Sequence, residues 1–168
     1  MLYVIYIGKE KENRKMEILF INGSPNKNGN TAVMAKELLG ENAYEALHLV
    51  DYKVYSYGQE FADDQFEEIV SKMKEAETIV IGSPVYWHSL SGAVRTLLDR
   101  FYGPVQQGEL KGRKLFFLFQ GAAPTKQMLA FGEYTMSRFA QLYGMPYMGM
   151  ATDLKEVQKL SAKLKEKK

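Results

Sequence analysis

The chain contains no cysteine and only two histidines among its 168 residues. Without cysteine it forms no disulfide, offers no thiolate nucleophile and has no sulfur ligand for an iron–sulfur cluster. Two histidines are too few for a usual zinc site. We therefore expect no metal, and any redox chemistry must come from an organic cofactor.

Long hydrophobic runs are also absent. No apolar stretch approaches the ~20 residues that a membrane helix needs, and the opening segment has neither a charged leader nor a small-residue cleavage site. We expect a cytoplasmic protein with no membrane partner. Apolar residues make up 46% of the chain, which is enough for the core of one domain of this length.

The net charge of +2 is concentrated at the two ends of the chain. Residues 153–168 carry six lysines against three acids, and residues 1–15 carry four bases against two acids. The C-terminal lysines are not interleaved with aromatic residues, as they often are in nucleic-acid binders. We expect a solvated helix face there and no nucleic-acid partner.

The first fifteen residues form an N-terminal extension to a domain that we place at 16–168. Residues 2–7 predict a strand, and residues 9–15 predict a charged linker. Either the extension adds an edge strand or pairs with a neighbouring subunit, or it lies upstream of a natural start at Met16. The sequence does not distinguish these alternatives.

From residue 16 onward, strand patterns alternate with helical patterns. This alternation predicts an α/β fold, a parallel sheet with helices on both faces, whose ligands bind beyond the carboxyl ends of the strands. The residues between the second strand and second helix, 51–61, predict a Tyr-rich loop, and Asp63 or Asp64 should cap that helix. The predicted strands are residues 17–23, 45–50, 78–82, 114–120 and 146–151, and the predicted helices are residues 32–39, 65–75, 89–101, 125–143 and 153–163.

The first of three informative loops is the polar turn at residues 24–31, which joins the first strand to the first helix. A helix starting near Gly29 or Asn30 would direct its free N–H groups at an anion. Ser24 and Thr31, together with Asn30, would add side-chain donors. Because neither Gly-Lys-Ser/Thr nor G-x-G-x-x-G occurs here, a monophosphate is favoured over a triphosphate or a dinucleotide. The alternative is an ordinary strand-to-helix connection.

The second loop, residues 83–88, holds the only tryptophan of the chain beside a tyrosine. Tyr86 and Trp87 would give a planar ligand a stacking surface. Alternatively, they cover the core beneath the following helix. His88 is a weak candidate for a catalytic base, because no carboxylate accompanies it at a fixed spacing.

The third loop, residues 120–124, is small and uncharged, which suits close approach of the backbone to a flat ring. Lys126 follows within one turn of the next helix. It would place a cation beside a reduced ring, although an exposed lysine is the simpler interpretation.

Two stretches, residues 23–31 and residues 82–92 with the continuation Leu98-Asp99-Arg100, resemble the NAD(P)H-dependent FMN reductase and flavodoxin-like quinone reductase family. The resemblance covers residues 16–151. It implies a flavodoxin-like three-layer sandwich with a five-stranded parallel sheet of order 2-1-3-4-5, and it implies FMN as a non-covalent cofactor. By resemblance, the phosphate contacts are Ser24, Asn26, Asn30 and Thr31, the ring contacts are Pro84, Val85, Tyr86 and Trp87, and the third loop contributes Gln120, Gly121 and Ala122.

The resemblance also implies the activity. NAD(P)H would be the co-substrate, the flavin would carry the chemistry without a catalytic side chain, and the acceptor would be a quinone, azo, nitro or flavin compound. One alternative is a flavodoxin, which carries electrons without substrate turnover, but flavodoxins are strongly acidic and this chain has a pI near 8.6. A second alternative is a flavin-free interaction or regulatory module on the same fold.

Members of this family are commonly homodimers. The predicted helix over residues 127–143 has more apolar surface than one sheet face needs, which fits a dimer contact. The alternative is a deeply buried helix. Iron–sulfur members of the family carry a cysteine cluster in the region of residues 51–61, where this chain has none, so their substrate preference does not transfer.

Overall fold

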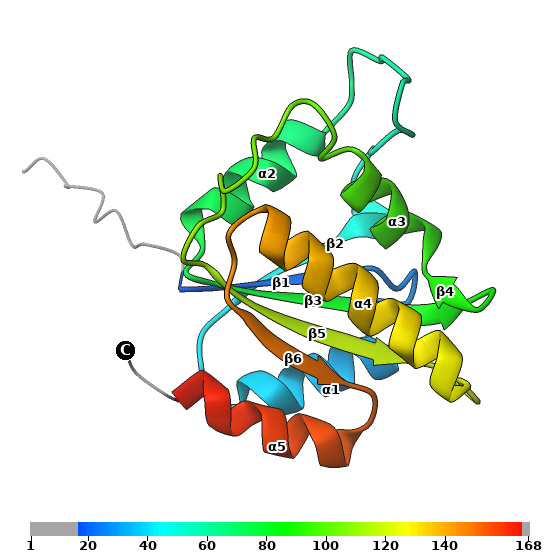
Figure 1. The fold of residues 1–168 in the computed structure, drawn as a ribbon, viewed down its shortest axis with the longest axis vertical. Helices are drawn as coiled ribbons and strands as arrows, with labels where there is room; N and C mark the ends of the chain where they lie inside the picture. Colours follow the sequence, from blue (N-terminus) through cyan, green and yellow to red (C-terminus); the bar gives the residue numbers. More distant parts are fainter. Residues whose placement is uncertain (1–16, 166–168) are drawn as a thin grey trace, which may run out of the picture.

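Five parallel strands form the centre of the computed structural model, which describes residues 17–165 (Figure 1). The predicted strand, linker and extension within residues 1–15 lie outside this range. The parallel strands are β1 (Ile18–Asn22), β2 (Glu45–His48), β3 (Thr78–Tyr86), β5 (Lys114–Gln120) and β6 (Tyr147–Ala151), and the short strand β4 (Ser89–Leu90) pairs antiparallel with β3.

The strands lie in the order β2-β1-β3-β5-β6. With β4 left out, the five strands follow the expected order 2-1-3-4-5. The predicted α/β class and five parallel strands are thus confirmed. The antiparallel β4 was not expected.

Helices cover both faces of the sheet. In Figure 1, α1 and α5 lie below it, and α2, α3 and α4 lie above it. None of the helices within residues 17–165 has the length and apolarity that crossing a membrane requires. The helices are α1 (Asn30–Leu39), α2 (Phe66–Glu75), α3 (Gly92–Asp99), α4 (Lys126–Leu142) and α5 (Leu154–Lys165), and a 3₁₀ turn η1 (Leu49–Asp51) follows β2.

The sheet is buried on both faces, so successive residues of each central strand enter different cores. In β1, Leu19 and Ile21 join the core beneath α2, α3 and α4. Ile18 and Phe20 join the core against α1 and α5. This arrangement explains why the strands read as continuous apolar runs rather than as alternating patterns.

Helix α2 buries the apolar stripe expected from its spacing. Phe66, Ile69 and Met73 are at most 1% exposed. The Phe66 N–H donates to Asp64 Oδ1 at 2.9 Å. The N-cap of α2 is nevertheless Gln65, which makes no side-chain cap hydrogen bond, so the prediction that Asp63 or Asp64 caps this helix was wrong by one residue.

Helix α4 approaches β5 closely, because Gly132 has no side chain. A Cβ at Gly132 would lie 2.3 Å from Phe119 Cε1. Met136 is buried, but Phe131 and Tyr134 are 59% and 65% exposed. The alternative of a deeply buried helix is therefore wrong for these two residues.

The loop predicted at residues 83–88 is mostly strand. β3 continues through Tyr86 because Ser89–Leu90 folds back against it. The following helix begins at Gly92 instead of Ser89, since Ser91 forms the N-cap and accepts the Val94 N–H at 3.4 Å. The prediction failed because it read the apolar run as ending at Gly82.

Candidate functional site

The loops after β1, β3 and β5 come together at the carboxyl ends of the parallel strands, at the right of Figure 1. Gln120 Nε2, at the end of β5, donates to Thr31 Oγ1 in the first loop at 3.3 Å. Gly121 lies against Val85 of β3, since a Cβ at Gly121 would be 3.0 Å from the Val85 Cβ. The structure therefore brings the three predicted loops together.

The first loop and the first two residues of α1, residues 23–31 together, are called the phosphate turn below, and side chains of the turn and of Asn22 shape it. Asn22 Oδ1 accepts the Ser24 N–H at 3.0 Å. Ser24 Oγ accepts the Asn26 N–H at 3.1 Å, and Asn26 Oδ1 accepts the Asn28 N–H at 3.1 Å. Each such bond closes a small turn between a side chain and the backbone two residues later. The turn is thereby held at every second residue.

This pattern leaves three backbone donors unused. Within residues 17–165, the N–H groups of Lys27, Asn30 and Thr31 have no hydrogen-bond acceptor. The N-cap of α1 is Gly29, which has no side chain to cap the helix, whereas α3 and α4 each have a side-chain cap. Unpaired donors at a helix N-terminus without a side-chain cap favour an anion.

Two hydroxyl groups face the same loop junction. Ser24 Oγ accepts the Asn26 N–H, and Thr31 Oγ1 accepts from Gln120. A hydroxyl that already accepts a hydrogen bond keeps its own proton to donate. Ser24 is 7% exposed and Thr31 is fully buried, so both donors are held in place. Asn26 and Asn30, the other two predicted phosphate residues, are exposed.

The floor of the site is a close contact between backbones. The Gly23 N–H donates to the Gly82 carbonyl at 2.8 Å. A Cβ at Gly23 would lie 2.1 Å from Val94 Cγ2 and 2.9 Å from that carbonyl oxygen. Glycine at this position is required by this close approach.

Two buried serines, which were not predicted as site residues, connect the first and second loops. Ser91 Oγ donates to the Gly23 carbonyl at 2.8 Å. Ser83 Oγ accepts the Ser91 N–H at 2.9 Å and donates to the Pro84 carbonyl at 2.9 Å. A serine just before a helical pattern is an N-cap signal, which would have found Ser91 but not its link to Gly23.

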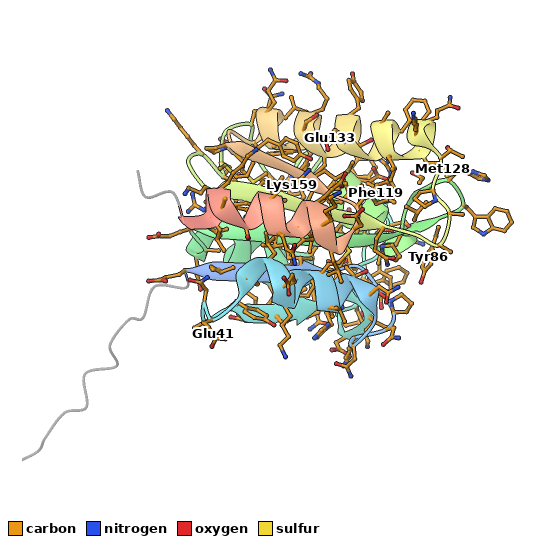
Figure 2. The ribbon with its side chains drawn as sticks, turned by 90° about the horizontal axis from the view of Figure 1, so that it is seen from below. Glu41, Tyr86, Phe119, Met128, Glu133 and Lys159 are labelled. Carbon is orange, nitrogen blue, oxygen red and sulfur yellow. The ribbon has the colours of Figure 1, made fainter. Side chains whose placement is uncertain are left out.

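The predicted ring contacts lie on the hairpin formed by β3 and β4. Pro84 is buried and Val85 is half-buried, whereas Tyr86 is 47% exposed and Trp87 is 94% exposed. The alternative in which these two aromatic residues cover the core is therefore wrong. Tyr86 lies at the same end of the molecule as Met128 of α4, and Glu41 lies at the opposite end (Figure 2).

The hairpin tip has unusual backbone geometry. Trp87 and His88 have φ angles of 46° and 65°. A two-residue hairpin turn of type I′ needs positive φ at both central residues, which bulky side chains rarely adopt. Such strain tends to collect at functional sites. His88 is exposed, with no hydrogen bond or ion pair to any residue in the described range.

Two contacts connect the phosphate turn to the end of β2. Asn22 Nδ2 lies 3.1 Å from His48 Nδ1. Lys27 forms a 2.6 Å ion pair with Asp51 of η1, and both side chains are 47% exposed. Neither pair was predicted. The sequence did contain one sign of the first contact, since Asn22 is a polar residue at the end of an apolar strand.

The titratable groups with shifted pKa values lie away from the three loops. A hydrogen bond from Arg100 holds the pKa of the Asp64 carboxyl below its ordinary value. Burial raises the pKa of Tyr147, and the Glu133 carboxylate, 3.0 Å from its hydroxyl, acts in the same direction. Within residues 17–165 no three His, Asp or Glu side chains gather as a metal site. The loops therefore offer hydrogen-bond donors and surface rather than an acid–base pair.

Two hollows lie outside the loops. One, of about 460 Å³, runs between α3 and α4, with Tyr102, Tyr134 and Arg138 in its lining. A larger one, of about 630 Å³, lies at the amino ends of the strands and is lined by residues such as Lys74 and Lys111. It lies away from the candidate site, since none of the three predicted loops lines it.

Comparisons with known proteins give a family match. Residues 16–163 match the family model described as NADPH-dependent FMN reductase. An iron-sulfur flavoprotein from Archaeoglobus fulgidus is 38% identical over 98 residues, which cover 51% of this chain and 48% of that protein. The chain spans about half the length of the first curated relatives that it matches.

Solved structures share the fold at low sequence identity. The Trp repressor binding protein from Bacillus subtilis superposes with a TM-score of 0.69 at 17% identity, covering 90% of this chain and 100% of that one. An FMN-dependent NADH-azoreductase from Bacillus anthracis, solved in complex with FMN, has a TM-score of 0.58 at 17% identity, covering 88% and 95%. These similarities confirm the flavodoxin-like architecture.

Proposed function

Because this chain belongs to the NADPH-dependent FMN reductase family, we propose that it is an FMN-dependent oxidoreductase. It uses NADPH or NADH to reduce an organic acceptor of the quinone, azo, nitro or flavin class. One observation carries the proposal: the loops after β1, β3 and β5 contact one another and present unused hydrogen-bond donors at one end of the sheet.

The phosphate turn fits the phosphate of FMN. Three backbone N–H groups, those of Lys27, Asn30 and Thr31, are unpaired within the described chain, and the hydroxyls of Ser24 and Thr31 keep a proton to donate. A dianionic monophosphate accepts several such bonds, and the positive end of the α1 dipole favours its charge.

The second and third loops fit a flat ring. Tyr86 and Trp87 expose aromatic surface on the hairpin. Across from them, the backbone N–H groups of Gly121 and Ala122 have no acceptor within residues 17–165. These donors suit negative charge on a reduced ring, and the absence of a Cβ at Gly121 lets the third loop lie against Val85.

Bound FMN supplies the hydride and electron transfer. The residues of this chain would hold it through its phosphate and offer backbone donors to its ring. No side-chain acid or base is needed. The Archaeoglobus fulgidus relative is named as an iron-sulfur flavoprotein, but this sequence has no cysteine to bind an iron–sulfur cluster.

A homodimer is part of the proposal. The outer face of α4 exposes Phe131, Tyr134 and Leu142, by 59%, 65% and 39%. Tyr102, 67% exposed, borders the same α3–α4 groove as Tyr134, and its ring packs edge-on against Tyr57, with ring centroids 6.3 Å apart. An apolar stripe of this kind is typical of an isologous interface.

FMN binding is tested first, by quenching of flavin fluorescence. We expect Thr31→Val, which keeps the side-chain shape and removes the hydroxyl, to weaken FMN binding about tenfold. Thr78→Val is the control, because Thr78 is buried at the amino end of β3, away from the loops. Equal FMN affinity in the two variants would contradict the phosphate assignment.

Activity is tested with the FMN-loaded protein. NADPH or NADH should be oxidised when a quinone, azo or nitro compound is supplied, and Trp87→Ala should change turnover more than FMN retention. Bound FMN with no oxidation of either nucleotide would indicate an electron carrier instead. Failure to bind FMN at all would favour the flavin-free alternative.

A further inference from the structure

We propose that His48 is a positioning residue for the phosphate turn and that it acts only as a neutral imidazole, so that acidification weakens binding of the phosphate group. His48 is the last residue of β2, beside Asn22 of β1 in the parallel ladder. The identity of the phosphate-bearing ligand as FMN rests on the function proposed above.

The orientation of the Asn22 amide is fixed by its neighbours. The Ser24 backbone N–H is a donor in every state, so the atom facing it at 3.0 Å must be the amide oxygen. The amide nitrogen then faces His48 Nδ1 at 3.1 Å. Asn22 is fully buried, so a flipped amide would leave two donors facing each other without water.

This geometry assigns the tautomer of His48. Because Asn22 Nδ2 donates, His48 Nδ1 must carry a lone pair, and the single proton of the neutral ring lies on Nε2. A protonated ring has N–H groups on both nitrogens. The Asn22 amide would then lose its acceptor, or rotate and leave the Ser24 N–H without one.

The phosphate turn depends on this first link. Asn22 holds Ser24, Ser24 holds Asn26, and Asn26 holds Asn28, each through a side-chain acceptor. Release of the first link frees the segment that places the Ser24 hydroxyl. Losing one hydrogen bond at a buried group corresponds to about a tenfold loss of affinity.

An opposite effect must be weighed, because an imidazolium also attracts phosphate. Several charged side chains on the elements around His48 are paired with each other. Lys27 of the turn pairs with Asp51 of η1, and on the opposite end of β2, Glu45 pairs with Lys72 of α2. On α3, which contacts η1, the charged pair is Arg95 and Asp99. Salt screens the attraction between a half-exposed imidazolium and the phosphate. It does not screen the loss of the hydrogen bond between Asn22 and His48.

The tautomer is tested without any ligand, by ¹⁵N NMR of the untagged protein. The chain has two histidines, so the exposed His88 serves as an internal reference. We expect His48 at pH 8 to show one tautomer, protonated at Nε2, and we expect the Ser24 amide signal to move between pH 8 and pH 5.5. A mixture of tautomers at His48, or a Ser24 signal that stays constant with pH, would overturn the proposal.

Affinity is tested by FMN titration from pH 8 to pH 5.5 in 0.5 M NaCl. The phosphate itself titrates near pH 6, so the comparison is between variants. His48→Gln keeps an acceptor for Asn22 without titrating, and His48→Leu has none. We expect the wild type to lose about tenfold more affinity than His48→Gln on acidification, and we expect His48→Leu to be about tenfold weaker at pH 8.

If acidification lowers the FMN affinity of the wild type and of His48→Gln by the same factor, the proposal is overturned. If no variant binds FMN at any pH, the proposed function fails instead, and the NMR result still decides whether His48 positions the turn.

Discussion

At the scale of single residues, the lack of a side chain at Gly82 allows the close packing beneath the phosphate turn. Gly82 lies beneath the phosphate turn, where a Cβ would be 2.4 Å from Thr31 Cγ2 and 3.1 Å from Phe20 Cε2. The methyl group of Thr31 therefore occupies the space that a side chain at position 82 would need. The hydroxyl of the same threonine accepts the hydrogen bond from Gln120 of the third loop.

We predict that Gly82→Ala destabilises the protein by about 2 kcal/mol through overpacking. Adding Thr31→Ser, which removes the obstructing methyl group and keeps the hydroxyl, should recover about 1 kcal/mol through coupling between the two sites. Urea unfolding of FMN-free protein measures both. Strictly additive effects of the two substitutions would show that this contact does not limit the packing.

The strain at the hairpin tip gives a second prediction. His88 has a φ of 65°, where glycine has no steric penalty, so His88→Gly should stabilise the protein by about 1 kcal/mol. Ser89→Gly is the matched control, because Ser89 lies in β4, where glycine should destabilise. Thermal unfolding compares the two. Destabilisation by both glycines would mean that the tip is not strained.

The phosphate turn was predicted from residue types alone, since hydroxyls, amides and glycines stand there between a strand and a helix. They did not reveal the partners of Asn22 and Ser91. Those partners, His48 and Gly23, lie 26 and 68 residues away in sequence and are brought close only by the strand order. A contact of this kind cannot be read from a local pattern.

At the scale of elements, one ion pair ties the segment before α2 to the end of α3. Arg100 contacts both carboxylate oxygens of Asp64 and also donates to the Tyr55 carbonyl at 3.0 Å. The two charged side chains are only 16% and 15% exposed. Their geometry is that of a bidentate pair, which is stronger than a single contact.

We predict that Arg100→Met destabilises the protein by about 3 kcal/mol at pH 7, because the Asp64 carboxylate is left nearly buried and unpaired. The folded pKa of Asp64 is depressed, so the stabilisation is complete above the ordinary aspartate value of ~3.9 and is lost as pH falls through the folded pKa. The difference between wild type and variant, measured by urea unfolding, should therefore shrink below about pH 4.

The control is Lys53→Met, which removes an exposed ion pair with Asp63 at 2.7 Å. That pair should contribute little, since solvent screens it. An equal loss of stability in the two variants would contradict the distinction between the buried and the exposed pair.

At the scale of the whole molecule, the alternation of patterns was sufficient to predict the three layers. Every parallel strand and every helix after residue 16 was predicted, with shifts of a few residues at the ends. The exposure of the aromatic residues could not be predicted. Trp87 and Tyr134 have the same local sequence pattern whether they cover a core or face outward. Exposure depends on the packing of distant elements.

The outer face of α4 gives the prediction at this scale. If it joins two copies, Phe131→Glu with Tyr134→Glu should convert a dimer to a monomer in sedimentation velocity. Val33→Glu is the control, since Val33 is 51% exposed on α1, on the opposite face of the sheet. A wild-type monomer, or dissociation by Val33→Glu alone, would contradict this interface.

The chain of bonds from Asn22 through Ser24 and Asn26 to Asn28 bears on the order of events after synthesis. These bonds use only atoms of the turn and the strand before it, so the turn acquires its shape when the polypeptide folds. The turn thus loses its conformational entropy during folding, before the ligand binds. The ligand then binds to a loop that is already ordered. Newly made protein should fold first and acquire its flavin later, and the same molecule should release and reload it without unfolding.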